Sequence, residues 1–154
     1  TGLLERKTYS EDDKKLGSHI VGMILLDMNS LKYINDTKGH LEGDKAIKAI
    51  AGIIEETTDQ RYMYAYRIGG DEFLIMSTST KHLSLENLVE RIKNETSKTP
   101  YTVSVGYCYR ESPEQDNIDI FKKAETMMYE EKKNYYKNTG HDRRHRSSEN
   151  PDSD

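Results

Sequence analysis

The sequence has one cysteine, no long apolar run and no excess of positive charge, and each shortage excludes a class of protein. The single Cys108 excludes an internal disulfide and fits a reducing compartment. The apolar run over residues 20–26 is too short to cross a bilayer. The formal net charge of −4, without a basic stripe, argues against a general nucleic-acid binder. We therefore expect a cytoplasmic domain, and the 154 residues suffice for one domain with a real core.

The chain begins at Thr1 without a methionine. We expect it to be a piece of a longer protein, with a sensory domain or a membrane anchor upstream. If that segment is an anchor, the full-length protein is membrane-anchored while this domain stays in the cytoplasm.

Two segments carry carboxylates at the ends of predicted strands. The apolar run 20–26 predicts a strand buried on both faces, with Asp27 at its exit. Gly69-Gly70-Asp71-Glu72 separates two further strand-like segments, so we expect a hairpin in which both glycines accept positive φ and the acids lie at the tip. Together the acids could form an oxygen-rich site for Mg²⁺. The alternatives are a helix-capping Asp27 and two solvated turn acids.

The remaining patterns complete a fold prediction. Helical spacing predicts helices over residues 3–16, 41–56, 84–99 and 118–136, and alternation predicts a strand over 101–109. The order strand-helix-strand-strand-helix-strand is the ferredoxin-like arrangement of nucleotide polymerase palms and nucleotidyl cyclases. We predict an α+β fold with a central antiparallel sheet flanked by helices. Residues 139–154 carry no apolar side chain and read as a disordered tail, or as arginines that fold onto nucleotide phosphates.

The motifs of the two acidic segments resemble those of the GGDEF family of diguanylate cyclases. The pentapeptide over residues 69–73 is intact. The family signature that precedes it is reproduced by Asp27, Asn29, Leu31, Lys32, Asn35, Asp36, Gly39, His40, Gly43 and Asp44. The opening Thr1-Gly2-Leu3, the strand around Ser104 and the last helix are also similar, so the resemblance covers residues 1–138 as one GGDEF domain.

The resemblance implies a metal-dependent bacterial signalling enzyme that condenses two GTP into cyclic di-GMP and releases two pyrophosphates. It places Asp27, the backbone carbonyl of Met28, Asp71 and Glu72 around two Mg²⁺ (or Mn²⁺) ions. Two such ions stabilise the attacking and leaving oxygens. Asp71 and Glu72 are the catalytic candidates, and for Asp71 a ligand role and a proton-acceptor role remain alternatives.

The resemblance also implies the substrate contacts. Asn35 and Asp44 would read guanine, because an amide offers a donor and an acceptor and a carboxylate accepts from N1–H and the exocyclic amine. His40 matches another substrate contact, and Gly69 and Gly70 leave room for a close approach. The backbone amides of residues 30–33, which open a short helical turn, would receive the β- and γ-phosphates, and Lys32 and Lys132 would add positive charge there. Each domain would bind one GTP, so catalysis would need a homodimer.

Two positions depart from the family pattern. Many members carry an arginine four residues after Lys132, where this chain has Tyr136. The product-inhibition motif Arg-x-x-Asp falls on Gln60-Arg61-Tyr62-Met63, without either charged end, so we expect no product feedback there. The alternative functions are an inactive GGDEF domain that senses GTP or relays a signal to a partner, and a structural dimerisation domain. An intact pentapeptide favours the enzyme.

Overall fold

A computed structural model describes residues 3–139 of the chain. Its elements, in chain order, are β1 (Leu4–Glu5), α1 (Arg6–Leu16), the 3-10 helix η1 (Gly17–His19), β2 (Gly22–Met28), α2 (Leu31–Lys38), α3 (His40–Thr57), β3 (Met63–Arg67), β4 (Glu72–Ser77), α4 (Leu85–Thr96), β5 (Val103–Tyr109) and α5 (Asn117–Thr139). The tail that we expect beyond residue 138 lies outside the described residues, apart from Thr139.

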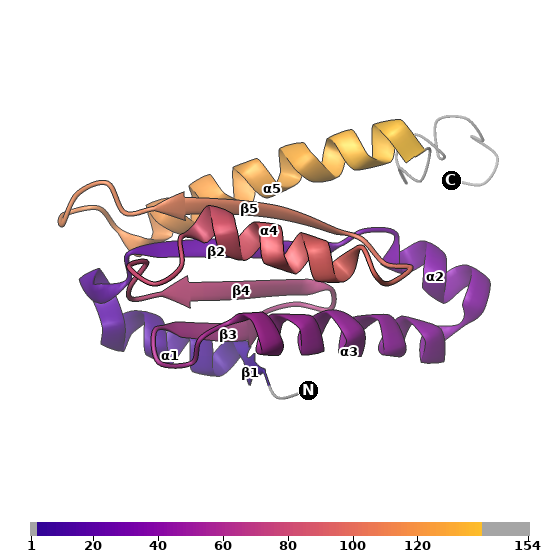
Figure 1. The fold of residues 1–154 in the computed structure, drawn as a ribbon, viewed down its shortest axis with the longest axis horizontal. Coiled ribbons are helices and arrows are strands. Elements are labelled where there is room, and N and C mark those ends of the chain that lie inside the picture. Colours follow the sequence, from indigo (N-terminus) through magenta and orange to yellow (C-terminus); the bar gives the residue numbers. More distant parts are fainter. Residues whose placement is uncertain (1–2, 140–154) are drawn as a thin grey trace.

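The strands form one sheet in the order β1-β3-β4-β2-β5 (Figure 1). The four strands β3, β4, β2 and β5 are antiparallel to their neighbours, while the short β1 pairs parallel with β3. With one helical segment before β3 and another before β5, this order is the ferredoxin-like arrangement that the sequence predicts. The predicted fold class is therefore confirmed.

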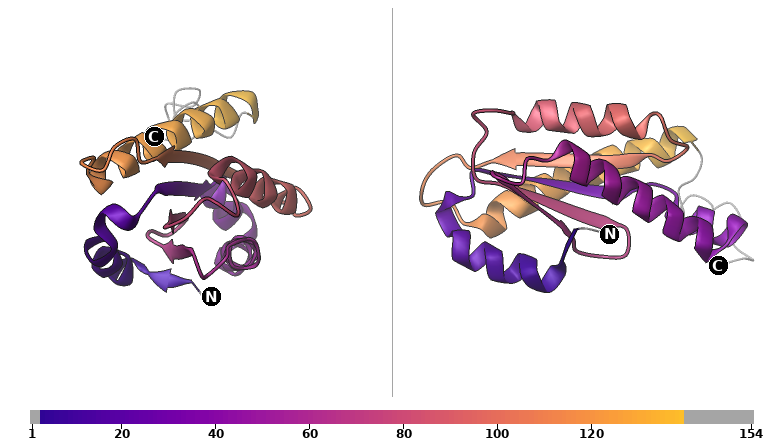
Figure 2. Two further views of the ribbon diagram at one scale, coloured as in Figure 1. Left: turned by 60° about the vertical axis from the view of Figure 1, so that its left-hand side comes forward. Right: turned by 60° about the horizontal axis from the view of Figure 1, so that its bottom comes forward.

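Two hydrophobic clusters lie on opposite faces of the sheet. The ribbon views of Figure 2 show the helices that cover these faces. Successive residues of a strand point to opposite faces, so Ile24 and Leu26 of β2 pack with α3 and α4, whereas Met23 and Leu25 pack with α5. Every residue of β2 is buried, as the apolar run predicts. The same alternation places Asp27 on the face that α5 covers.

The first helix begins later than predicted. Leu4 and Glu5 form β1, which pairs with Tyr66 and Arg67, so the helix begins at Arg6. The helical pattern of this segment is local, whereas the pairing with β3 joins positions far apart in the sequence. The long-range contact therefore determines the backbone of Leu4 and Glu5.

The hairpin between β3 and β4 is confirmed, but the expected backbone of its glycines is wrong. The positive-φ residues in the described part of the chain are Gly17, Ser30 and Gly39, and neither Gly69 nor Gly70 is among them. The connection is closed by the Ile68 N–H, which donates to the Glu72 carbonyl at 3.0 Å. A Cβ at Gly70 would meet no atom within 4 Å, so neither backbone conformation nor packing against the described residues requires glycine there.

Among residues 3–139, no helix combines the length and the apolar character that a membrane span requires.

Candidate functional site

Three carboxylates meet where β2 ends and β4 begins. Asp27 and Glu72 are directly opposite each other in the antiparallel pair. The Met28 N–H donates to the Asp71 carbonyl at 3.0 Å and so ties the hairpin end to the exit of β2. One carboxylate oxygen from each of Asp27, Asp71 and Glu72 lies within 4.8 Å of the others. The sheet register therefore brings together the acids that the sequence predicts to converge.

Asp27 is the buried member of this cluster, with 5% of its surface exposed. Its Oδ1 is buried and accepts no hydrogen bond. Burial raises the pKa of the Asp27 carboxyl to about 7, and the neighbouring Asp71 adds to this effect while the Lys132 ammonium opposes it. A buried carboxylate oxygen without a donor beside two further carboxylates suits a hard divalent cation, which binds oxygen ligands. The donor set therefore fits Mg²⁺.

Lys132 of α5 lies against this cluster. Its Nζ is 3.1 Å from Asp27 Oδ2 and donates to the Met28 carbonyl at 2.9 Å. The lysine side chain is 14% exposed. In this structure Lys132 thus contacts two of the groups that the resemblance assigns to the metal. Its ammonium favours the charged form of the Asp27 carboxyl and so opposes the rise in its pKa.

A second group of predicted residues lies on α2 and at the start of α3. Figure 1 shows that this part of the chain extends past the end of the sheet, while the rest of α3 runs alongside it. Gly43 is buried against Asn35, and a Cβ at Gly43 would lie 1.8 Å from Asn35 Oδ1. This close packing positions the Asn35 amide beside the turn of α3 that carries Asp44. Asp44, His40 and Lys32 are exposed. The structure therefore places the two guanine-reading candidates near each other, with Asp44 exposed and Asn35 half-buried.

Comparison with known proteins assigns the family. Residues 3–138 match the model of the family described as "Diguanylate cyclase, GGDEF domain". This chain belongs to the GGDEF family. Its GGDEF domain is 33% identical over 144 residues to the probable diguanylate cyclase DgcJ of Escherichia coli K12, covering 87% of the chain and 29% of DgcJ. It is also 30% identical over 118 residues to the cyclic di-GMP phosphodiesterase PdeR of the same organism, covering 71% of the chain and 18% of PdeR.

A solved structure agrees with the fold of this GGDEF domain. The coiled coil and GGDEF domain of DgcB from Caulobacter crescentus, in complex with c-di-GMP, superposes with a TM-score of 0.77 at 22% identity. The match covers 87% of this chain and 78% of that chain. The GGDEF domain described here spans less than a third of DgcJ and of PdeR.

The sequence predicts Lys132 of α5 in this GGDEF site, but it gives no sign of two further contacts that α5 makes with Ser30. The Ser30 N–H donates to the Tyr136 hydroxyl at 2.9 Å, and Ser30 Oγ lies 3.2 Å from the Tyr135 hydroxyl. Tyr136 was recognised as a departure from the family arginine, but no sequence pattern indicates where its hydroxyl lies.

Asn29, the family variant beside Asp27, is buried and holds β2 to β5. Ser104 Oγ donates to Asn29 Oδ1 at 2.7 Å, and Asn29 Nδ2 donates to Thr102 Oγ1 at 3.1 Å. Both ends of the amide are therefore used to fix the strand that leads into the carboxylate cluster.

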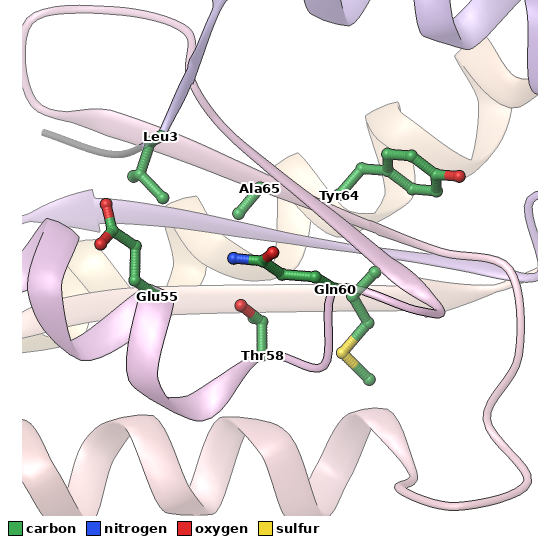
Figure 3. A pocket seen from close by; sticks show the side chains of 7 residues that line it. Leu3, Glu55, Thr58, Gln60, Tyr64 and Ala65 are labelled. Carbon is green, nitrogen blue, oxygen red and sulfur yellow. The ribbon is translucent and has the colours of Figure 1, made fainter.

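The window of the product-inhibition motif lies at the other end of α3. Gln60 lines a cavity of about 250 Å³ together with Leu3, Glu55, Thr58, Met63, Tyr64 and Ala65 (Figure 3). Met63, at the position of the motif's aspartate, is buried in β3. Arg61 pairs with Asp59, its Nη2 lying 2.8 Å from Oδ2. No cationic side chain is among the described residues that line this cavity. Gln60 also borders a second, open pocket, and that pocket contains Arg61, His82 and Arg91.

Proposed function

We propose that this domain is a diguanylate cyclase that joins two GTP molecules into cyclic di-GMP and releases two pyrophosphates. The observation that carries the proposal is the convergence of Asp27, Asp71 and Glu72, whose carboxylate oxygens lie within 4.8 Å of one another. This cluster lies at one end of the sheet. Of the predicted substrate residues on α2 and α3, Lys32, His40 and Asp44 are exposed and Asn35 is half-buried.

The carboxylates of Asp27, Asp71 and Glu72 and the carbonyl of Met28 would hold Mg²⁺ or Mn²⁺, two ions per site. When bound, such ions neutralise the charge on the attacking and leaving oxygens of phosphoryl transfer. Asp71 and Glu72 are half-buried, whereas Asp27 is buried and paired with Lys132. The two hairpin acids are therefore the ones in this cluster that can pass the proton of the 3′-hydroxyl to solvent.

Substrate orientation falls to other residues of the chain. Asn35 and Asp44 bind the guanine edge, and His40 lies on the same open surface. Lys32, in the first turn of α2, and Lys132 bring positive charge to the triphosphate. Gly69 and Gly70 keep the hairpin end free of side chains, so that a phosphate can approach the carboxylates closely.

The reaction needs two such domains. The described residues contain one cluster of three acids, and each GTP supplies one 3′-hydroxyl and one α-phosphorus. Two domains face to face would let each 3′-oxygen attack the α-phosphorus of the opposite GTP, with pyrophosphate leaving and the hydroxyl proton released. A sensory or membrane-bound segment elsewhere in the full-length protein would control this pairing.

The test is incubation of the domain with GTP and Mg²⁺, followed by chromatographic separation and mass spectrometry of the nucleotides. We expect cyclic di-GMP and pyrophosphate from the wild type. The Glu72→Gln variant, which removes one ligand charge at constant shape, should lose at least about 100-fold in rate. Glu55→Gln, at the distant cavity, serves as the matched control.

Two results would favour other functions. Tight GTP binding without product would indicate a GTP-sensing module, a possibility that the similarity to the phosphodiesterase PdeR makes worth testing. Absence of both nucleotide and metal binding would indicate a structural dimerisation domain.

A further inference from the structure

The side chain of Tyr136 lies at the point where α2 begins. Its hydroxyl accepts a 2.9 Å hydrogen bond from the N–H of Ser30, the residue that precedes the helix. Ser30 has a left-handed backbone, with φ 60° and ψ 22°, and its side chain makes no capping bond to the helix. The phenol oxygen of Tyr136 therefore serves as the acceptor for an amide at the start of α2.

That amide belongs to the region that would take phosphate oxygens. Backbone N–H groups at a helix N-terminus favour anions, because they point outward and the helix dipole adds positive potential. A separate observation indicates a ligand beside this amide. Asp27 Oδ1, near the end of the strand that leads into Ser30, is buried and has no hydrogen-bond donor, as a ligand of the cation that accompanies a triphosphate would be.

Two side chains of α5 thus contact the two kinds of group that a metal-bound triphosphate needs. Lys132 places an ammonium on Asp27 and on the Met28 carbonyl. Tyr136, one helical turn later, places an oxygen on the Ser30 amide. The Lys132 ammonium lies 5.5 Å from the centre of the Tyr136 ring, so the two side chains support each other.

We propose that Tyr136 is a competitor within the triphosphate site. Its hydroxyl holds the Ser30 amide in the nucleotide-free domain and leaves when the terminal phosphates of GTP bind. The inference rests on the proposed function, because it takes GTP as the ligand. An arginine at this position would add a phosphate contact, whereas Tyr136 has to be displaced, so it lowers the affinity for the terminal phosphates and leaves the guanine contacts untouched.

The test separates phosphate binding from guanine binding and from turnover. Inorganic tripolyphosphate with Mg²⁺, and GMP, are titrated separately into the wild type and into Tyr136→Phe by calorimetry. Loss of one competing hydrogen bond should lower the Kd for tripolyphosphate about three- to tenfold and leave the Kd for GMP unchanged. Tyr64→Phe, on β3, is the matched control and should change neither constant.

A tripolyphosphate Kd that is unchanged or higher in Tyr136→Phe would overturn the competitor role. A wild type that binds neither probe would overturn the proposed function together with this inference. If GMP and tripolyphosphate bind but the variant shows no gain, the inference alone fails.

A second measurement needs no variant. In the wild type, the amide resonance of Ser30 and the ring resonances of Tyr136 should move together as tripolyphosphate is added. Saturation of the site with the Tyr136 ring resonances unmoved would contradict displacement, whatever the variant shows.

Discussion

At the scale of single residues, the guanine-binding end of the proposed site depends on a glycine, Gly43, whose lack of a side chain leaves room for Asn35. Gly43 lies inside α3, where glycine is a poor helix former, yet its buried surface faces the Asn35 amide. Glycine at this position lowers the stability of α3, but any larger residue would clash with Asn35. Asn35 and Asp44 remain predictions as substrate contacts, and two substitutions test them.

Gly43→Ala should separate helix stability from ligand binding. The added methyl group would lie 1.8 Å from Asn35 Oδ1 and 2.8 Å from its Cγ, so the whole amide would have to move away, while alanine favours the helix by up to about 1 kcal/mol. We expect the Kd for GMP to rise about tenfold without a fall in the unfolding midpoint. Gly52→Ala on the same helix is the control, since a Cβ there meets nothing within 4 Å. Unaltered GMP binding in Gly43→Ala would argue against a role for Asn35.

Asp44→Ser should relax base selectivity. Adenine presents an unprotonated N1 to the Asp44 carboxylate, and a mismatch of this kind costs about 1–3 kcal/mol, or roughly tenfold to hundredfold in discrimination. The ratio of kcat/KM for GTP to that for ATP should fall by this factor in the variant. Asp36→Ser, at a neighbouring exposed acid, is the control. Full retention of GTP selectivity by the Asp44 variant would remove Asp44 from the guanine site.

At the scale of elements, α5 and β5 lie so close together at Gly106 that any side chain at this position would clash with the helix backbone. A Cβ at Gly106 would lie 2.0 Å from the Ala124 carbonyl oxygen and 2.4 Å from the Met128 nitrogen. The glycine in β5 thus lets the helix backbone rest on the strand, and this contact sets the height of Lys132 above Asp27.

Gly106→Ala should push α5 away from the sheet. Because the clash is with backbone atoms that cannot rotate away, we expect a loss of about 1–3 kcal/mol or more in the free energy of unfolding, measured by urea denaturation. Ala124→Gly introduced in addition should give no rescue, since it removes no backbone atom. A Gly106→Ala domain of unchanged stability would show that α5 can shift without cost.

The same elements show what the sequence can and cannot predict. The apolar run before Asp27 predicts β2, and the turn glycines predict the hairpin, because these signals are local. The predicted start of the first helix is wrong, because Leu4 and Glu5 pair with β3 and the helix begins only at Arg6. The contact of Lys132 with Asp27 and Met28 joins α5 to β2 and follows only from the sheet order. The left-handed Ser30, and the tyrosine that accepts from it, are determined in the same way by the approach of α5.

At the scale of the whole molecule, a domain with one acid cluster predicts activity that depends on association. Specific activity should rise with protein concentration and should become concentration-independent when a constitutive dimerisation module is fused to the domain. Measuring initial rates across a wide dilution series, with molecular mass determined in parallel, checks this. A monomeric sample whose specific activity stays constant on dilution would show that pairing is not required.

The direct pairing of Asp27 with Glu72 also has a consequence for the kinetics of unfolding. The two residues are far apart in the sequence and become neighbours only when β2 and β4 pair in register. A cation that needs both carboxylates binds the folded sheet and not the unfolded chain. If β2 and β4 pair after the folding transition state, the cation slows unfolding and leaves the folding rate almost unchanged. The bound cation would then hold β2 and β4 together and lengthen the lifetime of the folded domain in cells where Mg²⁺ is abundant.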